Sequence, residues 1–191
     1  MNRTIRPLLA TDREGVIGIL ENAGNFTVDE VTTARELIDE WLEQGEESGY
    51  LTYVLEEDSL GVLGYVCFGS TPLTEWTYDI YWIAVDKSKH RGGVGKRLLK
   101  FAEEEVTRRE GHLLLIETSS QETYGGTIQF YERTGYELVG KIKDYYKLAD
   151  DKLIFAKRLG LPVKTETLVS EPAMVESANG EGVPVEAPGG A

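Results

Sequence analysis

Apolar and polar positions follow two different rhythms along the first 160 residues. Short runs rich in β-branched and aromatic residues predict strands, and apolar residues that recur every three or four positions predict helices. The clearest helical rhythm combines an apolar stripe with an opposite face rich in Asp and Glu. Its stripe consists of Val31, Ala34, Leu37, Ile38, Trp41 and Leu42. The expected strands span 4–9, 50–56, 61–69, 77–85, 112–118, 136–143 and 152–159.

Two helix starts carry a capping pattern. Thr11 is followed by Glu14, and Thr27 by Glu30, in each case just before an apolar run. A Thr hydroxyl and a Glu three residues later can satisfy N–H groups that the first turn of a helix leaves free. We therefore expect one helix that ends near Asn22 and a second that carries the apolar stripe. Two further helices are expected over 94–109 and 126–134.

The order of these elements is β-α-α-β-β-β-α-β-α-β-β. Strict alternation of strand and helix would indicate a doubly wound parallel sheet, so this order predicts a mixed α/β sheet instead. The chain has 191 residues, of which 41% are hydrophobic, enough for one domain with a substantial core. We expect that domain to span residues 1–160.

Residues 161–191 differ in composition from the rest. They contain no aromatic residue, four prolines, four glycines, and five glutamates against one lysine. Such a segment cannot bury enough apolar surface to offset the entropy lost on ordering. We expect a disordered acidic tail.

Net charge narrows the range of partners. The formal net charge is -13, whereas nucleic-acid binding relies on Lys and Arg. We expect no nucleic-acid partner, and the charge fits either a basic partner or plain solubility. No stretch resembles a signal peptide or membrane span, so we expect a cytoplasmic protein without a membrane partner, as a monomer or homodimer. The single cysteine, Cys67, lies in an apolar run and is expected to be a small buried residue.

A glycine-rich loop precedes the helix expected at 94–109. Backbone N–H groups at such a helix start attract anions, and Arg91 and Lys96 add positive charge. Glycines alone are equally compatible with an ordinary loop. A P-loop would need Ser or Thr after Lys96, where Arg97 stands. A dinucleotide fingerprint would place its first glycine directly at the strand end, but five residues, 86–90, intervene. The loop reads His90, Arg91, Gly92, Gly93, Val94, Gly95 and Lys96.

At this loop the chain resembles the GNAT (GCN5-related N-acetyltransferase) superfamily. The strand end Ile83-Ala84-Val85-Asp86 and the glycine loop match one family motif, with His90 in place of the usual Gln or Arg. A second family motif matches at 130–136, which reads Phe-Tyr-Glu-Arg-Thr-Gly-Tyr. The usual Asn and Ala near the start of that helix are Tyr124 and Thr127. The resemblance covers about residues 4–159 and is closest to the branch that acetylates protein N-termini, including ribosomal-protein alanine.

The resemblance implies an acyl-CoA N-acyltransferase fold: a mostly antiparallel central sheet flanked by helices, with two central strands splayed apart. It implies that acetyl-CoA is bound by the loop 90–96 through its pyrophosphate and along the strand edge 83–85 through its pantetheine. Tyr124, Thr127 and Phe130 would lie beside the pantetheine. With two histidines and one cysteine far apart in sequence, no metal site is expected.

Amine acetylation needs a base for the amine, polarisation of the thioester carbonyl, and a proton for the departing thiolate. The resemblance assigns the proton to Tyr131, although this side chain could simply pack. It offers two bases, Glu117 and Asp79, each of which could instead be a solvated strand end. A main-chain N–H within 83–85 would polarise the carbonyl.

The acceptor amine is less defined. Tyr145 and Tyr146 resemble a tyrosine pair that contacts the peptide in the N-terminal acetyltransferase branch. Together with the acidic helix face, they favour a peptide N-terminus or a small basic amine, although the acidic face could simply be solvated. A non-catalytic CoA-binding module is the alternative, and a scaffold that acts through the acidic tail is compatible with either.

Overall fold

The computed structural model describes residues 2–89 and 92–160. His90, Arg91 and the tail predicted at 161–191 lie outside the described residues. The strands are β1 Arg3–Pro7, β2 Tyr50–Glu57, β3 Gly61–Ser70, β4 Thr77–Val85, β5 Leu113–Ser119, β6 Glu137–Lys147 and β7 Asp150–Arg158. The helices are α1 Arg13–Ala23, α2 Val28–Gln44, α3 Val94–Arg108 and α4 Gly125–Arg133. The predicted element order is confirmed, with boundaries that shift by a few residues.

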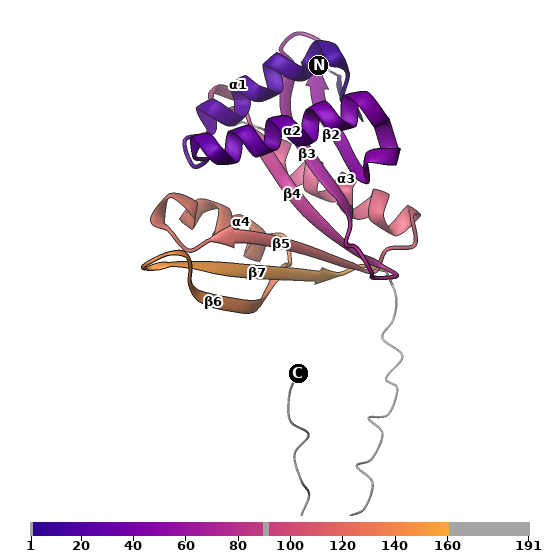
Figure 1. The fold of residues 1–191 in the computed structure, drawn as a ribbon. Helices are drawn as coiled ribbons and strands as arrows, with labels where there is room; N and C mark the ends of the chain where they lie inside the picture. The colour runs from indigo at the N-terminus through magenta and orange to yellow at the C-terminus, as the bar shows by residue number, and fades with distance from the viewer. Residues whose placement is uncertain (1, 90–91, 161–191) are drawn as a thin grey trace, which may run out of the picture. The chain divides into compact units, whose positions relative to one another are not determined.

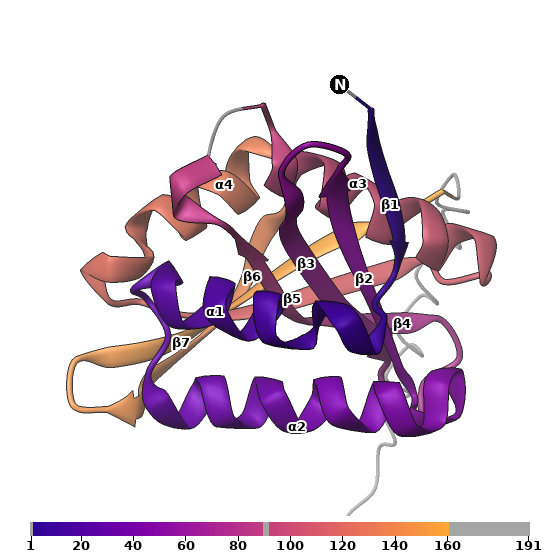
Figure 2. The same cartoon turned by 90° about the horizontal axis from the view of Figure 1, so that it is seen from above.

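One seven-stranded sheet has the order β1-β2-β3-β4-β5-β7-β6. Every neighbouring pair is antiparallel except β4 and β5, which are parallel because α3 connects them. Helices α1 and α2 lie on one face of the sheet and α3 and α4 on the other (Figure 1 and Figure 2). The predicted mixed, mostly antiparallel sheet is therefore confirmed.

The two parallel strands pair over a short stretch and then separate. Residues 77–80 of β4 pair with residues 113–116 of β5, and no described residue of β4 beyond Ile80 pairs with β5. Opposite β3, Cys67 pairs with Trp82 and Phe68 with Ile80, so Tyr81 is an extra residue that forms a bulge in β4. A bulge bends and twists its strand, and this one lies where β4 leaves β5. The predicted splay of the central strands is thus present (Figure 1).

Strand β3 is the centre of the core. Tyr65 and Phe68 are fully buried, because α1 packs on one face of the strand and α3 on the other. Cys67 is also buried, as expected, and burial raises the pKa of its thiol to about 12. No helix in the described part of the chain has the length and apolar character to cross a bilayer.

Of the two predicted capping boxes, one forms. Thr27 Oγ1 accepts from the Glu30 N–H at 3.2 Å, and the Glu30 carboxylate accepts from the Thr27 N–H at 2.7 Å. The box predicted at Thr11 is wrong, because Asp12 and not Thr11 accepts the backbone hydrogen bond at that helix start. Its carboxylate accepts the Leu9 N–H at 2.9 Å and a bidentate pair of bonds from Arg6. The first turn is therefore the 3-10 helix η1 Ala10–Asp12, and α1 begins at Arg13.

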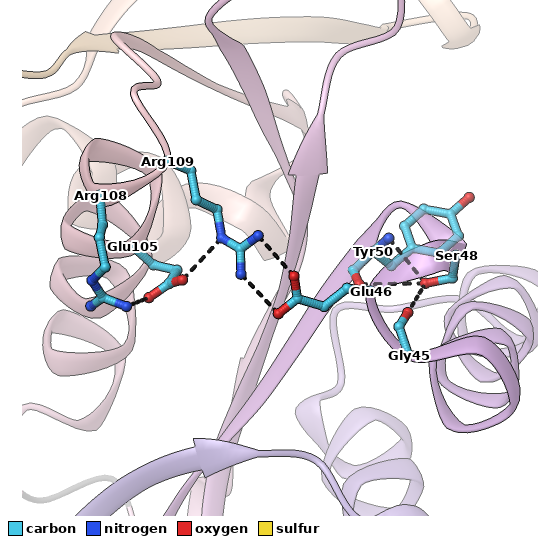
Figure 3. Close-up of polar contacts among 7 residues, drawn as sticks. All are labelled: Gly45, Glu46, Ser48, Tyr50, Glu105, Arg108 and Arg109. Atoms are coloured by element: carbon cyan, nitrogen blue, oxygen red, sulfur yellow. Dashed lines mark hydrogen bonds and ion pairs between the residues drawn. The ribbon is translucent and has the colours of Figure 1, made fainter.

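The end of α3 is tied to the turn after α2, which is the 3-10 helix η2 Gly45–Ser48. Arg109 donates to both carboxylate oxygens of Glu46, at 3.0 and 2.9 Å, and to Glu105 at 2.9 Å (Figure 3). Ser48 Oγ donates to the Gly45 carbonyl and accepts the Tyr50 N–H (Figure 3). Bidentate Arg–carboxylate pairs fix geometry well, so this network holds the entry to β2.

Candidate active site

A cleft of about 900 Å³ opens where β4 and β5 separate. The two candidate bases and the candidate acid, Asp79, Glu117 and Tyr131, all line it. Four other predicted site residues also line it, namely Ile83, Tyr124, Thr127 and Tyr146. The structure therefore gathers residues from α2, β4, β5, α4 and β6 around one gap in the sheet.

The candidate acid and bases approach this gap from opposite faces of the sheet. Cross-strand partners share a face, so Glu117 lies on the face of its β7 partner Ile154. Asp79 pairs with Leu115, two residues before Glu117, and so projects on that same face. The Tyr131 ring packs on Phe155, with ring centroids 5.8 Å apart, and Phe155 belongs to the other face. A group held in the gap would have a carboxylate on one side and a phenol on the other.

Tyr131 is surrounded by aromatic rings. Its centroid lies 5.6 Å from Phe130 and 6.1 Å from Tyr136, and only 4% of the residue is exposed. No described residue forms a hydrogen bond with its hydroxyl. Burial raises the pKa of the Tyr131 hydroxyl well above its ordinary value, because the phenolate would be poorly solvated. The hydroxyl thus keeps its proton at physiological pH and can donate a hydrogen bond to a basic group in the cleft.

Glu117 is held by a cation that lies outside the cleft lining. Lys152 Nζ forms an ion pair with Glu117 Oε2, and no described residue donates a hydrogen bond to Oε1. The Glu117 side chain is 47% exposed, whereas the Lys152 side chain is 14% exposed. Burial lowers the pKa of Lys152, but the hydrogen bond and charge of Glu117 outweigh it and the pKa is raised overall. One carboxylate oxygen is therefore anchored, and the other has no described hydrogen-bond donor, while the residue as a whole lines the cleft.

Asp79 has a neutral partner instead. Thr71 Oγ1 donates to Asp79 Oδ2 at 2.5 Å. Burial raises the pKa of Asp79, the Thr71 hydrogen bond opposes this rise, and the nearby Glu117 charge adds to it. A carboxylate near another negative charge is harder to ionise, which is the direction seen for Asp79.

The turn between β6 and β7 forms one wall of the cleft and is fastened to β5. Asp150 accepts from Ser119 Oγ at 2.5 Å and from Gln121 Nε2 at 2.6 Å. Lys152 Nζ lies 4.6 Å above the centre of the Tyr145 ring, which meets the Tyr146 ring edge-on at 4.9 Å. Tyr146 lines the cleft, whereas Tyr145, which was also predicted to contact the acceptor, does not line it.

Helix α2 forms the opposite wall. The Tyr124 hydroxyl donates to Glu30 Oε1 at 3.2 Å, which joins this wall to the start of α4. Burial raises the pKa of Tyr124, and the Glu30 charge raises it further. Near the start of α2, Phe26 packs edge-on against Trp82 of β4 at 5.4 Å.

Among the charged residues of the cleft lining, carboxylates outnumber cations. Among the described residues that line the cleft, Lys147 is the one cation. The carboxylates are Asp29, Glu30, Asp79, Glu117 and Asp150. A cleft with this charge attracts an ammonium group more strongly than an anion.

The glycine loop leads into α3 with the geometry that an anion site requires. Gly92 and Gly93 have φ of +108° and +68°, a region that residues with a Cβ adopt at a cost. Gly93 is the N-cap of α3, no side chain caps the helix, and its first turn has no acidic residue. The N–H groups of the first turn have no partner within the helix. A Cβ on Gly95 would lie 3.6 Å from Phe130, so α3 and α4 approach closely here.

The strand edge predicted to hold pantetheine is available in the gap. Residues Ile83, Ala84 and Val85 pair with β3 at Val66, Tyr65 and Gly64. Their other edge has no pairing partner in the described part of β5. An edge with unpaired N–H and C=O groups can pair with an extended ligand as it would with a strand.

Sequence reasoning missed several residues of this site. Lys152 contacts Glu117, Thr71 contacts Asp79, and Glu30 contacts Tyr124. None of these three contacts was predicted. Each of the three residues lies on a different element from its partner or in a loop, and only the tertiary fold brings the two together.

Comparisons with known proteins agree with this geometry. A family model described as "Acetyltransferase (GNAT) domain" matches residues 48–138. A curated relative, S-(2-succino)cysteine N-acetyltransferase from Bacillus subtilis (strain 168), is 28% identical over 92 residues, 47% of this chain. The matched part spans 56% of that relative's length.

Solved structures share the fold over nearly all of the described residues. A GNAT-family chain from Desulfovibrio desulfuricans is 38% identical, with a TM-score of 0.80 over 83% of this chain and 100% of its own. The ribosomal-protein-S18-alanine N-acetyltransferase from Escherichia coli is 22% identical, with a TM-score of 0.68 over 86% of this chain and 98% of its own. The second likeness shows the shared fold. With a close relative matched over its full length, the splayed strands and the glycine loop, the chain belongs to the GNAT family of acetyltransferases.

Proposed function

We propose that this chain transfers an acetyl group from acetyl-CoA to a primary amine, either a peptide N-terminus or a small amine, by direct attack within a ternary complex. The observation that carries the proposal is the cleft through the splayed sheet, with Tyr131 on one face and Glu117 and Asp79 on the other. Acetyl-CoA supplies the activated thioester. Everything else the reaction needs comes from the chain and the amine.

The cofactor face offers two binding elements. The first-turn N–H groups of α3, with Lys96 beside them, would hold the pyrophosphate. The free edge of Ile83–Val85 would pair with the pantetheine, and Phe130, Thr127 and Tyr124 would flank it. His90 and Arg91 remain predicted contacts that lie outside the described residues.

On the acceptor face, the cleft would draw in the protonated amine, and Glu117 would take its proton, directly or through a water. The amine nitrogen then forms a bond to the acetyl carbon, and the carbon–sulfur bond breaks. A main-chain N–H of residues 83–85 would polarise the carbonyl. The departing thiolate would receive the Tyr131 proton, and the second proton of the nitrogen would pass through water to the Tyr131 phenolate. The products are an amide and the free thiol of CoA, and Glu117 releases its proton to solvent. Tyr146, with the Tyr145 ring packed against it, would position the acceptor.

The test follows thiol release from acetyl-CoA with a panel of amines and short peptides, for the wild type and Tyr131→Phe. We expect turnover with at least one primary amine and a fall in kcat of about 10²-fold or more in the variant, since general-acid catalysis contributes factors of that order. Tyr136→Phe removes a hydroxyl from the same aromatic cluster and should leave kcat unchanged. Acetyl-CoA binding without thiol release on the whole panel would favour the non-catalytic module instead.

A further inference from the structure

Lys152 lies at the junction of two parts of the acceptor face. From β7 its ammonium pairs with Glu117 of β5, and it also lies 4.6 Å above the Tyr145 ring of β6. Tyr145 in turn supports Tyr146, which lines the cleft. The one side chain thus contacts both the candidate base and the aromatic wall.

We propose that Lys152 is a positioning residue for acetyl transfer: its ammonium orients Glu117 toward the cleft and, through the Tyr145 ring, holds the Tyr146 wall in place. This inference rests on the proposed function. Lys152 does not itself line the cleft, so it acts through its two partners.

The ion pair has a geometric consequence. A glutamate side chain has several rotamers, and Lys152 restricts Glu117 by anchoring Oε2. Oε1 is left to accept a proton from the amine. Because the Lys152 ammonium is mostly buried, its attraction is screened less by solvent than that of an exposed pair.

The cation–π contact has a separate consequence. Cations within about 6 Å of a ring centre are attracted to the ring face. Lys152 thereby fixes the Tyr145 ring, whose face would otherwise be open to solvent on an exposed strand. The edge-on contact between the Tyr145 and Tyr146 rings then restricts the Tyr146 ring as well.

The turn does not depend on Lys152 for its fold. Asp150 is bonded to Ser119 and Gln121, the Asp151 N–H donates to Ser120 Oγ at 2.8 Å, and Lys141 pairs with Asp151 at 2.7 Å. Loss of the Lys152 ammonium should therefore leave the β6–β7 turn in place.

Several charged or titratable groups surround Glu117. From β4 comes Asp79, from β7 Lys152, and from β6 Tyr145 and Tyr146. The other charged groups that line the cleft are Asp29, Glu30, Lys147 and Asp150. Among these, Lys152 is the cation in direct contact with Glu117, and its charge also lowers the pKa of Asp79.

The test compares Lys152→Met with Lys152→Arg and with Lys143→Met, which removes the same charge from an exposed position of the same hairpin that does not line the cleft. In Lys152→Met we expect kcat to fall about tenfold or more, because Glu117 loses the ammonium that orients it. The KM for the amine should also rise, because the Tyr145 ring no longer supports the Tyr146 wall. Lys152→Arg should restore most of both effects, and Lys143→Met should show neither.

Carbon-13 NMR of the side chains supplies a readout that needs no turnover. In Lys152→Met the Glu117 carboxyl and Tyr145 ring resonances should shift and broaden, whereas in Lys152→Arg they should stay near their wild-type positions. Unmoved resonances of both residues in Lys152→Met, or a kcat and an amine KM equal to the wild-type values, would overturn the proposal. If Lys152→Met does not fold, Tyr145→Leu tests the aromatic half: it should raise the amine KM and leave kcat in place, and an unchanged KM would count against the proposal. A wild type without thiol release on any amine would refute the proposed function, while the NMR comparison would still decide the role of Lys152.

Discussion

The two faces of the cleft control protons by opposite means. On the cofactor face, Tyr131 lies among aromatic rings with 4% of its surface exposed. On the acceptor face, Glu117 and Asp79 are paired with Lys152 and Thr71 and are partly open to water. Burial alone keeps a proton on the phenol, whereas each carboxylate is held by a polar partner, a lysine ammonium or a threonine hydroxyl.

This difference teaches how one small cleft can hold an acid and a base at the same pH. A desolvated phenol stays neutral over the whole physiological range, so it is always ready to donate. A carboxylate in an acidic cleft tends to retain its proton unless a cation compensates. The base therefore needs a charged partner, whereas the acid needs only an apolar environment.

The largest expected effect comes from removal of the carboxylate on the acceptor face. Glu117→Gln should lower kcat/KM about 10²-fold or more at neutral pH, because the amine loses its proton acceptor. The loss should shrink as the pH approaches the pKa of the amine, which then loses its proton to solvent. Steady-state pH profiles measure both features.

Asp79→Asn is the matched comparison on the same face. It removes a negative charge near Glu117 but leaves Glu117 in place, so we expect a rate loss of about tenfold or less. If Asp79→Asn abolishes turnover while Glu117→Gln retains it, Asp79 is the base. If neither variant changes the rate, both assignments fail.

An intermediate effect is expected from the cofactor face. Gly93→Ala places a Cβ at φ +68° and should raise the KM for acetyl-CoA about fivefold, because a strain of about 1 kcal/mol shifts the loop. The KM for the amine should not change. Gly61→Ala is the control: its φ is +71°, a Cβ there also meets open space, and it lies in the β2–β3 turn. Both variants should lose similar thermal stability, and an equal rise in KM in both would argue against the loop as the anion site.

The smallest effect is expected from an ion pair outside both faces. The Arg109 hydrogen bond lowers the pKa of Glu46 below its ordinary value of 4.5, so this pair stabilises the fold above that pH and the contribution is lost as the pH falls through the folded pKa. Glu46→Gln should therefore lower the free energy of unfolding by about 0.5 kcal/mol near neutral pH, less in high salt, and by nothing in strong acid. Thermal melts at several pH values measure this. Its kcat should equal that of the wild type, and a change would mean that this network reaches the cleft through Tyr50.

Much of the fold was predictable because its signals are local. The apolar stripe of α2, the box at Thr27 and the run 77–85 each lie within a few residues, and the structure confirms them. The start of α1 was not predictable, because it depends on a hydrogen bond from Arg6 of β1 to Asp12. This contact joins two different elements and has no local pattern. In the site, the motifs led to Glu117, Asp79 and Tyr131, which the structure brings to one cleft.

The sequence by itself determined the order of elements, the family motifs and the residue types that acetyl transfer would use, because those depend on local periodicity and spacing. Only the tertiary structure decided which face each group occupies and what charge lies beside it. The register of β5 on β7 puts Lys152 within reach of Glu117, and the bulge at Tyr81 lies where the gap opens. Strand register and bulges are set by packing across the whole sheet, so no short stretch of sequence specifies them.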